Sequence, residues 1–189
     1  MDVVLFHSMW GLRPVERGAA ERLRAQGHQV ALPDLFDGRT APGEIGAGFA
    51  LMEELGWSTI VGRARDALSR APDDAALVGF SMGVGVIGEV WPDRLGAAAV
   101  ACLHAPVSVP SGVRPGTPVQ LHYAAGDRFA PPEQVAEFRR SAEAAGAVAV
   151  VREYPDAGHY FTDESHPDFA AVAAAAAWRE ISDMLRSVD

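Results

Sequence analysis

The chain has 189 residues, of which 49% are hydrophobic and 22% charged, and its net charge is −9 at pH 7. This length and apolar share predict one globular domain over residues 1–189 with a core of its own. Because an acidic chain repels phosphate backbones, we expect no nucleic-acid partner. The single cysteine, Cys102, rules out an internal disulfide, which is typical of a reducing compartment.

The first residues, Met1 to Phe6, lack the basic start and the long apolar stretch of a signal peptide. No segment approaches the roughly 18 apolar residues of a membrane span. We therefore expect a cytoplasmic protein without a membrane partner.

Short apolar, β-rich runs alternate with longer helical patterns along the chain. The predicted strands are residues 3–6, 28–32, 75–80, 97–103, 119–123 and 148–154. The predicted helices are residues 15–26, 45–55, 60–69, 84–90, 131–145 and 169–188. Continuously apolar strands favour a mostly parallel, six-stranded, doubly wound α/β sheet covered on both faces. Such sheets place their sites at the carboxyl ends of the strands.

Ser81 stands at the centre of the sequence GFSMG, between the third predicted strand and the helix that follows it. In a nucleophile elbow a sharp strand-to-helix turn lifts the serine oxygen clear of the sheet, and the flanking glycines leave room for the backbone. The helix N-terminus presents oriented N–H groups to a developing oxyanion. This context favours Ser81 as a nucleophile. The alternative is a tight glycine-rich turn whose serine caps the helix.

A nucleophilic serine needs a histidine base and an acid that orients it, in the chain order serine, acid, histidine for this architecture. Asp127 lies just past the end of the fifth predicted strand, and His159 just past the sixth. Both residues fall where the topology requires, which predicts the triad Ser81, Asp127 and His159.

Other acids and histidines fit this order less well. Asp156 shares the loop of the candidate base and does not follow the fifth strand, while Asp163 and Glu164 come after that base. His166 is the nearest rival base, but its place before a proline is typical of a helix entry. No His/Asp/Glu cluster has the spacing of metal ligands, so neither a metal nor another cofactor is expected.

An oxyanion hole in such a site takes one N–H from the residue after the nucleophile and one from the loop after an early strand. Met82 is the first candidate donor. Met9 is the second, with Trp10 as its alternative, because both follow the first predicted strand. The other interpretation of that loop is a plain strand-to-helix connection. The candidate residues of the substrate pocket are Trp10, Phe36, His104, Phe129 and Tyr160.

Four blocks of sequence together resemble the dienelactone hydrolase family, a branch of the α/β-hydrolases. They are HSMWGL at 7–12, GFSMG at 79–83, GDRFAP at 126–131 and AGHYF at 157–161. The resemblance spans most of the chain and implies an α/β-hydrolase fold. It also implies the triad named above and hydrolysis of an ester or lactone without a cofactor. No insertion is long enough for a cap domain, so only the stretch 36–56 could cover the site.

Three positions depart from the family pattern. Ser81 stands where dienelactone hydrolases proper have cysteine, and Ser8 stands where they have the glutamate tied to activating that thiol. Four residues after the candidate base, where the family has an arginine that grips a substrate carboxylate, this chain has Asp163. We expect Asp163 to repel a carboxylate, so dienelactone itself is not the expected substrate.

These observations predict a serine-dependent hydrolase whose partner is a small-molecule carboxylic ester or lactone. An acyltransferase or a cofactor-free perhydrolase with the same triad is an alternative. A non-catalytic binding protein on the same fold is a further one. The complete triad argues against it, because a protein that only binds has no physical need for all three groups.

Overall fold

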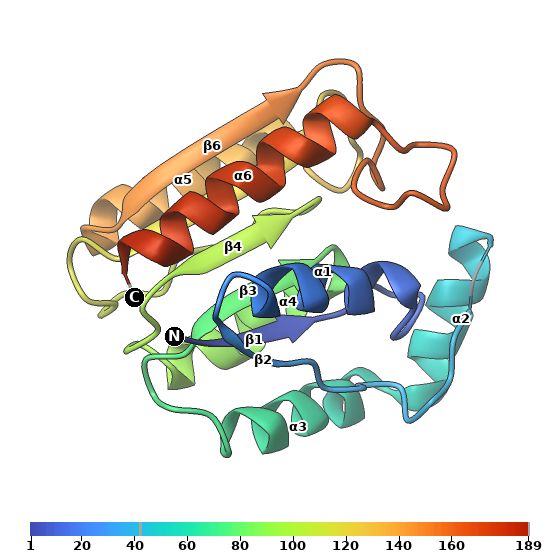
Figure 1. The fold of residues 1–189 in the computed structure, drawn as a ribbon, viewed down its shortest axis with the longest axis horizontal. Coiled ribbons are helices and arrows are strands. Elements are labelled where there is room, and N and C mark those ends of the chain that lie inside the picture. The colour runs from blue at the N-terminus through green and yellow to red at the C-terminus, as the bar shows by residue number, and fades with distance from the viewer. Residues whose placement is uncertain (42, 189) are drawn as a thin grey trace.

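A parallel sheet forms the centre of the computed structural model, which describes residues 1–41 and 43–188. The six strands lie in the order β2-β1-β3-β4-β5-β6, and every neighbouring pair is parallel (Figure 1). The strands are β1 (Asp2–Phe6), β2 (Gln29–Ala31), β3 (Ala76–Phe80), β4 (Val100–Leu103), β5 (Pro118–Ala124) and β6 (Val148–Tyr154). The predicted parallel, six-stranded sheet is therefore confirmed.

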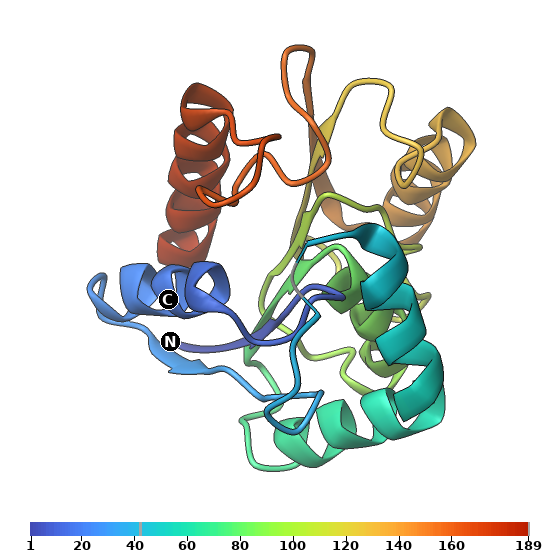
Figure 2. The ribbon, with the colours of Figure 1, turned by 90° about the vertical axis from the view of Figure 1, so that its right-hand side faces the viewer.

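Helices cover both faces of this sheet. They are α1 (Pro14–Arg24), α2 (Ile45–Leu55), α3 (Trp57–Leu68), α4 (Met82–Val90), α5 (Pro132–Ala145) and α6 (Ala171–Ser187), with one 3-10 turn, η1 (Trp91–Asp93). Figure 2 shows α1 and α6 on one side of the sheet and α3, α4 and α5 on the other. This is the doubly wound arrangement that the alternation of strands and helices predicted.

The strands are apolar throughout because both sheet faces are buried. Val3 and Leu5 of β1 pack with Trp178 of α6 in one core layer. Val4 and Phe6, whose side chains point to the opposite face, belong to the other layer with the residues of α3, α4 and α5. Within the described residues, no helix has the length and apolarity needed to span a bilayer.

The predicted and observed elements differ mainly at their ends. The fourth strand begins at Val100 rather than at residue 97, after a turn in which the Ala97 N–H bonds to the Arg94 carbonyl. Helix α3 begins at Trp57 rather than at residue 60, directly after Gly56. Gly56 has a φ of 79°, so one residue ends α2 and starts α3. The spacing of apolar residues alone did not show that the next helix begins directly after Gly56.

The strand order brings three loops to the carboxyl edge of the sheet. Strand β3 lies beside β4, β4 beside β5, and β5 beside β6, with Ala124 paired to Tyr154 at the ends of the last two. In Figure 1, α2 and the loop that joins β6 to α6 lie at this same end of the molecule. The segments after β3, β5 and β6 are therefore the ones that can assemble a site.

Candidate active site

Ser81 occupies the sharp turn between β3 and α4. Its backbone has φ 48° and ψ −104°, a strained conformation for a residue other than glycine. A Cβ on Gly83 would come within 2.4 Å of the Phe6 carbonyl oxygen, and a Cβ on Gly79 within 2.8 Å of the Gly83 backbone. Both glycines are thus needed for α4 to pack against β1 and β3, as an elbow requires.

Ser81, His159 and Asp127 form one continuous hydrogen-bonded line. The Ser81 Oγ lies 2.8 Å from Nε2 of His159, and Nδ1 of the same ring lies 2.5 Å from Oδ2 of Asp127. Because a carboxylate only accepts hydrogen bonds, Nδ1 carries the proton and Nε2 is free to accept the one from the serine. The structure therefore brings together the three side chains that the sequence proposed.

The Asp127 carboxylate is fixed through both of its oxygens. While Oδ2 faces His159, Oδ1 accepts the Phe129 N–H at 2.9 Å. The Asp127 side chain is only 3% exposed and that of His159 9% exposed. Water therefore competes little for these contacts, and the acid can hold one imidazole orientation.

The loop after β1 lies against the start of α4. The Gly83 position contacts the backbone oxygens of Phe6 and His7, so this loop runs beside the elbow. Within it the Gly11 N–H bonds to the Ser8 carbonyl at 3.1 Å, and Gly11 takes a φ of 84°. These contacts bring the loop that carries Met9 alongside the start of α4.

Met82 is the first residue of α4, so its N–H has no acceptor inside the helix. This is the position at which the sequence placed the first oxyanion donor. Met9 and Trp10 are both buried, and α2 packs on them, since a Cβ on Gly48 would come within 3.0 Å of Met9 and 3.1 Å of Trp10. The second donor stays a prediction between these two residues.

The five candidate pocket residues separate into two groups. Phe129 and Tyr160 lie against the His159 ring, with ring centroids 4.6 Å and 4.5 Å away. Trp10 stacks on Tyr160 at 4.0 Å. The other two are Phe36 and His104, and all of the five except Phe129 are buried.

Phe36 packs edge-on against the His7 ring and is fully buried, and among the described residues no ring contact joins it to the candidate triad. His7 itself joins two loops: its Nε2 accepts the Leu35 N–H at 3.0 Å and its Nδ1 donates to the Ser8 carbonyl at 2.7 Å. Burial lowers the pKa of His7, which keeps the ring neutral and able to make both bonds.

His104 lies behind the candidate base. Its ring centroid is 5.5 Å from that of His159, and its Nε2 lies 2.9 Å from the Thr162 hydroxyl. Burial, with the neighbouring His159 acting in the same direction, holds the pKa of His104 well below its usual value. Its backbone φ of 77° is strained. Sequence reasoning placed His104 after a strand but gave no sign of this contact with the loop at 160–162.

A family model settles the classification of this chain. The model of the dienelactone hydrolase family matches residues 1–188. The chain belongs to the dienelactone hydrolase family. Membership makes it a hydrolase-family protein of the α/β-hydrolase class, as its four sequence blocks predicted. No curated protein matches the chain at a significant level.

Solved structures share the fold at low sequence identity. A dienelactone hydrolase-like promiscuous phosphotriesterase from metagenomic libraries is 19% identical over 99% of this chain and 86% of its own, with a TM-score of 0.79. Mouse alpha/beta hydrolase domain-containing protein 10 is 11% identical over 100% of this chain and 90% of its own, with a TM-score of 0.69. A chain from the metagenome-derived lipolytic enzymes LipS and LipT is 15% identical over 98% and 93%, with a TM-score of 0.60.

Asp163, which replaces an arginine of the dienelactone hydrolase family, does not present a free charge. Its carboxylate is 4% exposed and lies 2.8 Å from the Arg13 guanidinium. It also accepts hydrogen bonds from the backbone and hydroxyl of Ser165 at 2.9 and 2.6 Å. The Arg13 guanidinium, which also lies 3.5 Å from the Glu16 carboxylate, offsets part of the Asp163 charge, and the repulsion of a substrate carboxylate by Asp163 stays a prediction. The sequence could not reveal a partner 150 positions away.

Helix α2 covers part of the site. Phe49 of α2 is 48% exposed and lies 6.4 Å, centroid to centroid, from Phe129, which in turn contacts His159. The predicted covering stretch thus reaches Phe129, the neighbour of His159, through α2. The exposed Phe49 gives the approach to Ser81 an apolar side.

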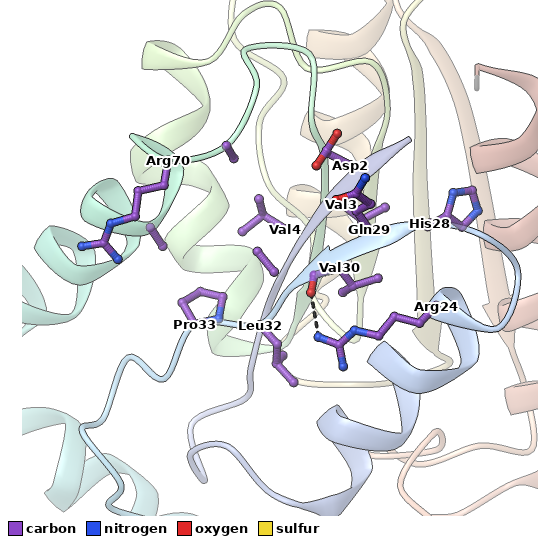
Figure 3. Close-up of a pocket in the computed structure, with 13 residues that line it drawn as sticks. Asp2, Val3, Val4, Arg24, His28, Gln29, Val30, Leu32, Pro33 and Arg70 are labelled. Atoms are coloured by element: carbon purple, nitrogen blue, oxygen red, sulfur yellow. Dashed lines mark hydrogen bonds between the residues drawn. The ribbon is translucent and has the colours of Figure 1, made fainter.

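A hollow of about 650 Å³ lies at a different place, between the start of β1, strand β2 and the end of α3, and Figure 3 shows the residues that line it. Its polar side chains come from Asp2, Arg24, His28, Gln29 and Arg70, and the Arg24 guanidinium donates to the Val30 carbonyl at 2.7 Å. None of its lining residues belongs to the candidate triad. Within residues 1–41 and 43–188, no group of three or more His, Cys, Asp or Glu side chains could hold a metal ion.

Proposed function

We propose that this protein hydrolyses carboxylic esters or lactones through an acyl-enzyme formed on Ser81. The observation that carries the proposal is the unbroken line from the Ser81 Oγ to His159 at 2.8 Å and on to Asp127 at 2.5 Å. A serine hydroxyl is a weak nucleophile until a base accepts its proton, and this line supplies the base with its orienting acid.

In the proposed first step the Ser81 oxygen attacks the ester carbonyl carbon while its proton passes to Nε2 of His159. Asp127 stabilises the imidazolium that forms and keeps its own charge. The carbonyl oxygen becomes an oxyanion, which would accept hydrogen bonds from the Met82 N–H and from an N–H of Met9 or Trp10. Each such donor is worth roughly 3–4 kcal/mol in a comparable site.

Collapse of this intermediate expels the alcohol, which takes the proton from His159 and leaves an ester bond to Ser81. Water then attacks the acyl group with His159 again as base, which releases the carboxylic acid and restores the serine. A lactone follows the same course, except that its alcohol stays joined to the acid. No step needs a metal or a redox cofactor.

The surroundings of Ser81 favour a substrate with an apolar part. Phe129 contacts the candidate base, and the exposed Phe49 extends the apolar approach. Arg13 pairs with the Asp163 carboxylate, and the exposed Arg128 lies over the Phe129 ring at 4.7 Å. We therefore include esters of both neutral and anionic acids among the substrates to be tested.

The test compares turnover of chromogenic esters and lactones, varied in acid charge and chain length, by the unchanged protein and by Ser81→Ala. We expect Ser81→Ala to lower kcat at least about 10⁴-fold while the thermal unfolding midpoint stays near that of the unchanged protein. Ser69→Ala is the matched control, because this exposed hydroxyl only bonds the Asp66 carbonyl. Full turnover by Ser81→Ala would overturn the proposal.

Alcohols or peroxide added as competing acceptors separate hydrolysis from acyl transfer. If water is the main acceptor, the acid forms at nearly the same rate with and without them. A dominant ester or peracid product would instead identify an acyltransferase or perhydrolase with the same triad.

A further inference from the structure

Tyr160 follows the candidate base directly in sequence and is 2% exposed. Its hydroxyl is buried and makes no hydrogen bond of good geometry among residues 1–41 and 43–188, although the Ser81 hydroxyl lies near enough to lower its pKa. Buried tyrosine hydroxyls usually have a partner, and an unsatisfied one destabilises the folded state. The buried Tyr160 hydroxyl therefore destabilises the free protein, and a bound molecule that accepts its hydrogen bond would remove this cost.

The phenol lies at the candidate nucleophile. The Tyr160 ring meets the His159 ring edge to face, 4.5 Å between centroids and 83° between planes. Burial raises the pKa of Tyr160 to about 12, and the nearby Arg13 and the Ser81 hydroxyl act in the opposite direction. The phenol thus stays protonated at neutral pH, with its O–H available as a donor close to Ser81.

Tyr160 is held rigidly from three sides. Its ring stacks on Trp10 with centroids 4.0 Å apart and planes 24° apart, and the His166 ring lies 5.0 Å away. Its N–H donates to Oδ2 of Asp168 at 3.1 Å. A donor fixed in this way needs little reorganisation when charge develops beside it.

The stack on Trp10 places the Tyr160 ring beside the loop after β1, the segment that supplies the second candidate oxyanion donor. The same ring meets His159, so Tyr160 contacts both that loop and the candidate triad.

We propose that Tyr160 is a third oxyanion donor, whose O–H bonds to the carbonyl oxygen of the substrate as that oxygen becomes negative. This role rests on the proposed hydrolysis at Ser81. The phenol keeps its proton throughout, so the bonds made and broken are those of the acyl transfer alone.

The experiment compares Tyr160→Phe with Tyr154→Phe in the full chain. Tyr160→Phe removes a buried hydroxyl that makes no hydrogen bond of good geometry in the free protein, so its unfolding midpoint should equal or exceed that of the unchanged protein. Its kcat for a short-chain ester should fall about 10- to 100-fold with KM within about twofold, because the lost bond strengthens only in the transition state. Tyr154→Phe removes a hydroxyl that bonds His122 at 3.0 Å, so it should lower stability and leave kcat unchanged.

A trifluoromethyl ketone supplies a readout that a purely structural role would not change. It adds to a serine as a tetrahedral anion, so its affinity should weaken in Tyr160→Phe by the same factor as kcat/KM. An unchanged kcat in Tyr160→Phe, or a change confined to KM, overturns the donor role.

Ser81→Ala, assayed alongside, separates the two proposals. If Ser81→Ala loses turnover while Tyr160→Phe keeps it, only the role of Tyr160 fails. If Ser81→Ala keeps turnover, hydrolysis at Ser81 fails and the role of Tyr160 fails with it.

Discussion

At the scale of single residues, the His159 ring lies between a hydrogen-bond acceptor, Asp127, and a hydrogen-bond donor, Ser81. Nδ1 of His159 can only donate to Asp127, so Nε2 is left to accept from Ser81. An asparagine in place of the acid would keep the size of the side chain but could present its amide N–H to the ring. That would favour the wrong tautomer, with the proton on Nε2.

Asp127→Asn should therefore lower kcat for ester hydrolysis by about 10⁴-fold while the fold is kept. Steady-state kinetics with a chromogenic ester, together with a thermal unfolding curve, measures both effects. Asp156→Asn is the matched control, since this carboxyl shares the loop of His159 but makes no contact in the triad. A kcat for Asp127→Asn within tenfold of the unchanged protein would contradict the role assigned to Asp127.

The positions of Asp127 and His159 could be predicted from sequence because each follows a strand, and parallel strands bring their carboxyl ends to one edge. The contacts of Asp163, His104 and Tyr160 could not be predicted in the same way. Each depends on a partner from a distant segment, such as Arg13 for Asp163. The loop at 160–168 has no periodic pattern that would indicate which of its side chains turn inward.

At the scale of elements, the elbow depends on how closely α4 approaches β1. Gly83→Ala would place a Cβ 2.4 Å from the Phe6 carbonyl oxygen, and backbone cannot move aside cheaply. We expect this change to lower the free energy of unfolding by about 1–3 kcal/mol and to displace Ser81 enough to reduce turnover. Urea unfolding and ester hydrolysis measure the two effects.

Gly62→Ala is the matched control within a helix. A Cβ at Gly62 of α3 meets nothing within 4 Å, so alanine should stabilise the protein by about 0.5–1 kcal/mol through helix propensity. Turnover should not change. Equal stability in Gly83→Ala and Gly62→Ala would show that the elbow is not closely packed.

Arg13 connects the loop after β1 and α1 to the loop after β6. Its guanidinium pairs with the buried Asp163 at 2.8 Å and lies 4.8 Å from the Trp10 ring. Its backbone N–H donates to Glu16 at 3.1 Å, and the same carboxylate accepts the Ser8 hydroxyl at 2.8 Å. These polar contacts fix the candidate oxyanion loop relative to the loop that carries the base.

Arg13→Met would leave the Asp163 carboxylate buried without its cation. We expect the free energy of unfolding to fall by about 3–5 kcal/mol, and the double variant Arg13→Met with Asp163→Leu to recover part of that loss. A double-mutant cycle by urea unfolding measures the coupling. Strict additivity of the two single changes would mean that the pair contributes no interaction energy.

The order and type of the elements could be predicted because their apolar patterns are strong. Strand β6 (Val148–Tyr154) and helix α2 (Ile45–Leu55) have the predicted ends. The start of β4 was placed three residues early, because the apolar run at 97–103 does not show where ladder pairing begins. The sequence shows that residues 97–103 are apolar, but the strand starts only at Val100, where backbone pairing with β3 and β5 begins.

At the scale of the whole molecule, buried neutral histidines make stability depend on pH. Burial lowers the pKa values of His7 and His104, and lowers that of His122 to about 4. Between pH 4 and the ordinary value of 6.5, the unfolded chain therefore binds protons that the folded chain does not. The free energy of unfolding must therefore fall as the pH is lowered through this window. Above pH 6.5 these three histidines are neutral in both states and do not make stability depend on pH.

Urea unfolding at about pH 7.5 and about pH 5 should show this loss, at up to about 1.4 kcal/mol per pH unit for each such histidine. His122→Gln should lessen the difference between the two pH values, because glutamine has no proton to gain. If His122→Gln shows the same difference as the unchanged protein, His122 does not contribute to the acid sensitivity.

The central claim for the molecule is that Ser81 is the nucleophile of a hydrolase in the dienelactone hydrolase family. An active-site-directed fluorophosphonate reacts only with a serine that has been activated by its base. Peptide mass spectrometry of the labelled protein should find one adduct, on Ser81, and none after Ser81→Ala or heat denaturation. An unlabelled Ser81 in the folded protein, or an adduct on another serine, would contradict the assignment.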